Sequence, residues 1–114
     1  MGLDVVLYRM VRPPVGASRR PSYVPVEVVD DSDDVLLRLL TRVRGGGRTP
    51  LLDRFDPTGE LVVGASEAPR LLAELRSLSE MAGSPAEAAR LRALVALIRR
   101  CLRGHDVQIR FEGD

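Results

Sequence analysis

Residues 84–104 read SPAEAARLRALVALIRRCLRG and contain the longest helical pattern in the chain. Ser84 and Glu87 form a capping box with Pro85 at the first helical position, which marks the start of a helix. Apolar residues then recur at the spacing of one broad helix face, and Gly104 ends the pattern. These residues are Leu91, Leu94, Val95, Ile98, Cys101 and Leu102. A long amphipathic helix is therefore predicted.

A second helical pattern directly precedes the first. Ser66 is its predicted N-cap, Pro69 lies in its first turn, and Gly83 ends it. Its apolar stripe consists of Leu71, Leu72, Leu75 and Leu78. Because only a short turn joins the two helices, we expect them to pack antiparallel and to cover one face of a sheet.

The N-terminal part of the chain predicts two strands and a helix. Residues 3–11 are rich in branched apolar side chains, and residues 23–29 alternate, with Val24, Val26 and Val28 on one predicted face. Pro25 cannot donate to a strand ladder, so 23–29 is expected at a sheet edge. The acids of DDSDD (30–34) then precede a helix that GGGR (45–48) ends. The apolar stripe of that helix is Leu36, Leu39, Leu40 and Val43.

The stretch LLDRFDPTGELVV (51–63) predicts a hairpin, with strands at 51–55 and 60–63. Asp56 begins a type I turn that Gly59 closes in a left-handed conformation. Asp53, Asp56 and Glu60 do not have the spacing of a calcium loop, and no histidine lies near them. We therefore interpret this acidic stretch as a turn, with Glu60 and Arg54 paired across it.

At the C-terminal end of the chain, Val107, Ile109 and Phe111 alternate with Gln108, Arg110 and Glu112, which is typical of a half-buried strand. The predicted order is β-β-α-β-β-α-α-β. This order favours a single α+β domain over residues 1–114, with two layers. One layer is a mixed, mostly antiparallel sheet of about five strands, and the other contains the three helices.

The composition is that of an ordinary globular domain. Of the 114 residues, 45% are apolar, which is enough for one core. The one cysteine, Cys101, cannot form an internal disulfide and fits a reducing compartment. We recognise no signal peptide and no membrane-spanning run, so a cytoplasmic protein without membrane contact is expected.

All 17 basic residues are arginine, and the 16 acids leave a net charge of +1. Guanidinium groups bind phosphate well, but a high-GC bacterial genome also produces this skew, and we favour that second explanation. The balanced charge disfavours nucleic acid as a partner. The candidate contacts for a partner or an anion are Arg12, Arg19, Arg20, Arg44 and Arg48.

No residue pattern in the chain is typical of a known catalytic site, and we predict no metal site and no cofactor. The GGGR segment follows a helix, whereas a phosphate loop precedes one. His105 is the only histidine and has no nucleophile at a recognisable spacing. It has acidic candidates for a partner in Asp56, Asp106 and Asp114, which leaves a small acid–base site as an alternative.

Three segments carry a resemblance: MGLD at 1–4, LLDRFDPTGELVV at 51–63 and HDVQIRFEGD at 105–114. They resemble a group of small, uncharacterised single-domain proteins of high-GC bacteria. The resemblance implies an α+β domain with an R-x-D-P-x-G hairpin and a closing F-x-G-D. It implies no assigned activity, although some members are similar to immunity proteins beside polymorphic toxins. The positions that it singles out are Arg54, Asp56, Gly59, His105, Gly113 and Asp114.

The sequence thus favours a non-enzymatic, cytoplasmic protein-binding module, either immunity-type or accessory. The expected contacts are the edge strand 23–29, which also offers a route to a homodimer, and the Arg-rich loop 12–22. The first alternative is a small ligand-binding protein or an enzyme that uses His105 with a carboxylate. The second is a weak nucleic-acid binder that acts through the Arg-rich loops.

Overall fold

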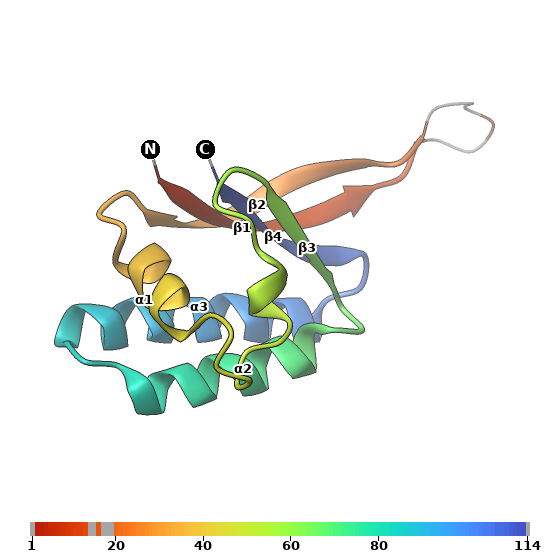
Figure 1. Ribbon diagram of the computed structural model, residues 1–114. Helices are drawn as coiled ribbons and strands as arrows, with labels where there is room; N and C mark the ends of the chain where they lie inside the picture. The colour runs from red at the N-terminus through yellow and green to blue at the C-terminus, as the bar shows by residue number, and fades with distance from the viewer. Residues whose placement is uncertain (1, 14–15, 17–19, 114) are drawn as a thin grey trace.

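The computed structural model describes residues 2–13, 16 and 20–113. The strands form one sheet, and the helices pack against it in an α+β arrangement (Figure 1). In chain order they are β1 (Leu3–Val11), β2 (Ser22–Asp31), α1 (Val35–Val43), the short 3-10 helix η1 (Leu52–Arg54), β3 (Glu60–Gly64), α2 (Ala68–Met81), α3 (Pro85–Arg103) and β4 (Val107–Gly113).

The sheet has four strands in the order β2-β1-β4-β3, and every pairing in it is antiparallel. All three α-helices lie on one side of this sheet (Figure 1). The prediction of a two-layer α+β fold with three helices is confirmed, whereas the predictions of a mixed sheet and of about five strands are wrong. The position of β2 at one edge agrees with the prediction made from Pro25.

The missing strand is the one predicted at 51–55, where the chain forms η1 instead. Leu51 and Leu52 are both buried, although they are adjacent in sequence. A strand would have placed them on opposite faces, whereas a helical turn turns both toward the core. The carboxylate of Glu74 on α2 fixes this turn, since it accepts the N–H groups of Leu51 and Leu52 at 3.0 Å each. The observed order is therefore β-β-α-β-α-α-β.

The core lies between the sheet and the helices. The predicted stripe of α2 is confirmed at Leu71, Leu75 and Leu78, which are fully buried. On α3 the buried face includes Leu97, which the sequence pattern missed, while Leu102 in the last turn is 40% exposed. The buried α3 residues are Leu91, Leu94, Leu97, Ile98 and Cys101.

The helix starts differ in how they are capped. The Ser84 hydroxyl accepts the N–H group of Glu87 at 3.2 Å, as predicted. The predicted cap Ser66 is wrong, because α2 begins one residue later, after Glu67, and no side chain caps it.

At α1 the buried carboxylate of Asp31 accepts the N–H groups of Leu36 and Leu37 at 2.8 and 2.9 Å. Arg90 of α3 binds the same carboxylate. Burial raises the pKa of Asp31, and these donors offset part of the rise.

Candidate functional site

His105 lies in the turn between α3 and β4, where its side chain is exposed. Within the described residues it makes no hydrogen bond and no ion pair. Its neighbour Asp106 pairs with Arg12 instead, at 3.4 Å, and Asp114 lies outside the described residues. The described structure therefore does not assemble an acid–base pair around His105.

Asp56 begins the turn that leads into β3. Its Oδ1 accepts both the N–H group and the hydroxyl of Thr58 at 2.9 Å, and its carbonyl accepts the N–H group of Gly59 at 2.8 Å. These Thr58 donors lower the pKa of the Asp56 carboxyl. The turn is confirmed, but it does not join two strands. The left-handed conformation predicted for Gly59 is also wrong, because no hairpin here requires it.

The turn at Asp56–Gly59 packs against the end of β4. Gly113 donates its N–H group to the carbonyl of Gly59 at 2.9 Å. A Cβ atom on Gly113 would lie 1.9 Å from the carbonyl oxygen of Pro57, so only glycine fits there without movement. Two of the sequence motifs thus meet in space, and their contact is structural.

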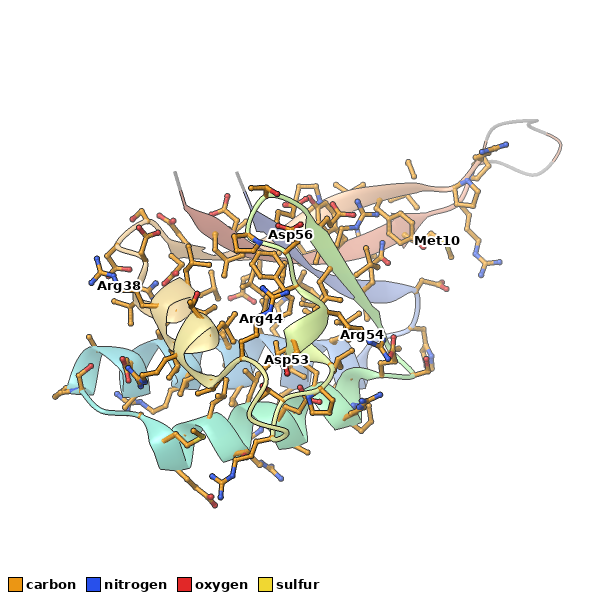
Figure 2. All side chains as sticks on the ribbon, in the orientation of Figure 1. Met10, Arg38, Arg44, Asp53, Arg54 and Asp56 are labelled. Atoms are coloured by element: carbon orange, nitrogen blue, oxygen red, sulfur yellow. The ribbon has the colours of Figure 1, made fainter. Side chains whose placement is uncertain are left out.

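The other groups near this turn are also engaged in local contacts (Figure 2). Asp53 accepts the N–H group of Gly45 at 3.1 Å and the hydroxyl of Thr49 at 3.0 Å. Arg54 pairs with Glu67 at 3.4 Å, so the predicted pairing with Glu60 is wrong. Once 51–55 is helical, the two side chains no longer face each other across a hairpin. No cluster of metal-ligating residues occurs in the described part of the chain.

The candidate arginines fall into two groups. Arg12 and Arg20 lie near the far end of the β1–β2 hairpin, whereas Arg44 and Arg48 lie in the loop after α1 (Figure 1). All four are exposed, and Arg19 lies outside the described residues. The hairpin end projects away from the α1 loop, so the two groups do not form one basic surface.

A small cleft lies between α1 and the segment that contains η1. Its walls are Leu37, Leu40, Thr41, Arg44, Leu52, Phe55 and Pro57. The enclosed space is about 10 Å³, which is room for about one water molecule. This cleft is too small to enclose an organic substrate.

The sheet face opposite the helices has no helix over it (Figure 1), and we call it the open face. Alternation along each strand assigns its residues, because the core residues of the same strands point to the helices. The open face consists of Tyr23, Pro25, Val28 and Asp30 of β2; Asp4, Val6, Tyr8 and Met10 of β1; Gln108, Arg110 and Glu112 of β4; and Glu60, Val62 and Gly64 of β3.

Arg110 is at the centre of the contacts on this face. Its guanidinium carbon lies 4.5 Å from the ring centroid of Tyr8 and 5.0 Å from that of Tyr23. The Tyr8 hydroxyl donates to the Glu112 carboxylate, at 2.9 Å from its nearer oxygen. Burial and the hydrogen bond to Glu112 raise the pKa of Tyr8, and the charge of Glu60 adds to the rise. The alternation of Gln108, Arg110 and Glu112 was the signal in the sequence for this surface.

A bulge interrupts the pairing of β2 with β1. Leu7 pairs with Glu27 and Tyr8 pairs with Pro25, so Val26 is the extra residue. Val24 and Val28 consequently lie on opposite faces, and the prediction that 24, 26 and 28 share a face is wrong. The bulge changes the direction of the chain next to Pro25, which has no N–H group to donate.

Exposed apolar side chains concentrate on the β1–β2 hairpin. Within the described residues, eight large hydrophobic side chains are exposed, and five of them belong to this hairpin. They are Val11, Tyr23, Val24, Val26 and Val28, with exposed fractions of 41 to 51%. The far end of the hairpin extends past the helices, so apolar residues are exposed on both of its faces there (Figure 1).

Comparison with known proteins gives no relative, since no family model, curated protein or solved structure matches this chain. None of the helices in the described ranges is long and apolar enough to cross a membrane.

Proposed function

We propose that this chain is a non-enzymatic protein-binding module that binds its partner through the β1–β2 hairpin and the adjoining open face. The observation that carries the proposal is the concentration of exposed valines and Tyr23 on one hairpin. Contiguous apolar surface of this kind marks interaction sites on soluble domains. An immunity-type role, which the sequence resemblance implies, is one form of such binding.

The residues around the hairpin also suit a protein partner. Tyrosine and arginine are enriched where proteins bind one another. Here Tyr8, Tyr23 and Arg110 form one stacked group, with Val28 and Val62 exposed on the same face. The stack limits the motion of these side chains before binding, which reduces the entropy lost when a partner orders them.

Addition of a partner strand to β2 is a narrower form of the same proposal. β2 is an edge strand, but its bulge at Val26 and the missing donor at Pro25 interrupt the ladder it offers. The bulge divides β2 into two shorter regular segments, 22–25 and 27–31. The open face is therefore the larger of the two contacts that we propose.

The test compares a hairpin variant with a matched control in co-purification from a native lysate. The variant Val26→Thr with Val28→Thr replaces one methyl group of each of two exposed valines of the hairpin with a hydroxyl, without a charge change. The control, Met81→Thr, changes an apolar residue of similar exposure at the end of α2. We expect the hairpin variant to lose its partners and the control to retain them, at unchanged Tm for both. Equal recovery from the two variants would remove the hairpin from the binding site.

A further inference from the structure

The edge strand β3 turns backbone hydrogen-bonding groups away from the sheet. Gly113 donates its N–H group to the carbonyl of Gly59 at 2.9 Å, in line with the β3–β4 register. Opposed residues of antiparallel strands alternate between bonded and non-bonded pairs, so Leu61 and Val63 also bond to β4. The backbone groups that face outward are those of Glu60, Val62 and Gly64.

Most of these outward groups have no partner within the described residues. The exception is the carbonyl of Gly64, which accepts the N–H group of Glu67 at 3.0 Å. β3 contains no proline, and no bulge interrupts its pairing with β4. The side chain of Val62, in the middle of the strand, is 43% exposed. An edge with these properties is a template for another strand.

The opposite edge of the sheet, β2, is protected. Met10 donates its N–H group to the carbonyl of Asp106 at 2.6 Å, in line with the β1–β4 register. By the same alternation Tyr8 also bonds to β4, so Pro25, which lies opposite Tyr8, turns its nitrogen outward. Proline at an outward position and the bulge at Val26 both hinder the addition of a strand. The two edges therefore differ, and β3 is the one suited to pairing.

We propose that two copies of this chain pair through β3, antiparallel and about a twofold axis at Val62. Their two four-stranded sheets then form one continuous sheet, with a β2 strand at each end. Val62 of each copy exchanges N–H and C=O bonds with Val62 of the other, and Gly64 donates its N–H group to the carbonyl of Glu60. The two exposed valine side chains meet on the open face. This inference goes beyond the proposed function, because it uses neither of the β1–β2 hairpins.

The residues of β3 favour a second copy as the occupant and select this register. β3 runs from Glu60 to Gly64, so a twofold axis at its middle residue pairs its whole length. Glu60 then lies opposite Gly64 of the other copy, where a Cβ atom would have nothing within 4 Å, so its side chain has room. A register shifted toward the start of the strand would place the two Glu60 carboxylates opposite each other, which is destabilising. A shift the other way pairs fewer residues.

The first experiment is sedimentation equilibrium of the full chain between about 5 and about 500 µM. A contact between two strands of five residues is small, so we expect a transient dimer. The average mass should rise from that of one chain toward that of two over this range. The mass of a single chain at every concentration would overturn the proposal.

Two matched variants locate the contact. Val62→Lys places two cations opposite each other at the twofold axis, and we expect this variant to remain monomeric. The control, Val28→Lys, makes the same charge change at an exposed valine of the other edge strand and is expected to dimerise like the parent protein. Equal dimerisation of the two variants, or loss of the dimer in Val28→Lys alone, would overturn the contact through β3.

Amide hydrogen exchange tests the same contact in the unmodified protein. The N–H groups of Val62 and Gly64 are free in one chain and bonded in the dimer. We expect their exchange to slow at least about threefold between about 50 µM and about 1 mM protein, and by a larger factor than that of Leu61 and Val63. Exchange that does not slow at Val62 and Gly64 would overturn the proposal, and so would slowing that is confined to β2.

Discussion

The two faces of the sheet are built from alternate residues of the same four strands and differ in almost every property. On the covered face, Val5, Val63, Ile109 and Phe111 have no exposed surface. On the open face, one residue away from Val63, Val62 is 43% exposed. The burial that stabilises the domain is concentrated on one face, which leaves the other face free to carry residues chosen for contact.

The charged residues differ between the two faces as well. On the covered side, Asp31 and Glu74 are buried, and each accepts two backbone N–H groups and pairs with an arginine. These carboxylates complete the local structure of α1 and η1. On the open face the carboxylates are aligned with one another.

The sharpest stability test of this contrast compares two neighbouring valines of β3. We expect Val63→Ala to lower the free energy of unfolding by about 2 to 3 kcal/mol, because it removes buried methyl groups and leaves a cavity. Val62→Ala removes the same atoms from the open face and is expected to change the free energy of unfolding by less than about 0.5 kcal/mol. Urea denaturation of both variants measures the difference. Similar losses in the two would show that the open face is also part of the core.

Much of this contrast was present in the sequence. The helical spacing of leucines predicted α2 and α3, and alternation predicted that Ile109 and Phe111 point inward while Arg110 and Glu112 point outward. These patterns are local and follow directly from the periods of helix and strand. They predicted the fold class and the two layers.

What the sequence could not predict depends on contacts between distant residues. The 51–55 segment has an apolar pattern compatible with either a strand or a turn, and the Glu74 carboxylate, more than twenty positions away, decides for η1. The alignment of Asp30, Asp4, Glu112 and Glu60 required the strand order and register. Because of the bulge at Val26, Val24 and Val28 lie on opposite faces of the sheet, and no local sequence pattern predicted the bulge.

Two glycines extend the comparison to the backbone. Gly113 faces the covered side, where a Cβ atom would lie 1.9 Å from the Pro57 carbonyl oxygen, whereas Gly64 faces open space. We expect Gly113→Ala to destabilise the protein by about 1 to 3 kcal/mol, the range for overpacking, because its Cβ atom would meet a backbone carbonyl. Gly64→Ala is the control, and its Tm is expected to stay close to that of the parent protein. Equal Tm values for the two variants would mean that the close packing of Gly113 against the turn does not stabilise the protein.

The smallest expected effect concerns Asp56, which holds the turn that closes the covered face. The N–H group and hydroxyl of Thr58 lower the pKa of Asp56 below its ordinary value of 3.8. The folded state therefore favours the ionised carboxyl, and this contribution is present above pH 3.8 and is lost as the pH falls through the lowered value. At pH 7 we expect Asp56→Ala to lower Tm by less than Gly113→Ala does. The difference from the parent protein should then narrow as the pH falls below 3.8. A difference in Tm between Asp56→Ala and the parent protein that persists unchanged into acid would show that Thr58 does not stabilise the carboxylate.

Glu60→Gln, which neutralises a carboxylate of the open face, is expected not to lower Tm at pH 7. A large loss for Glu60→Gln would show that this carboxylate of the open face also stabilises the fold.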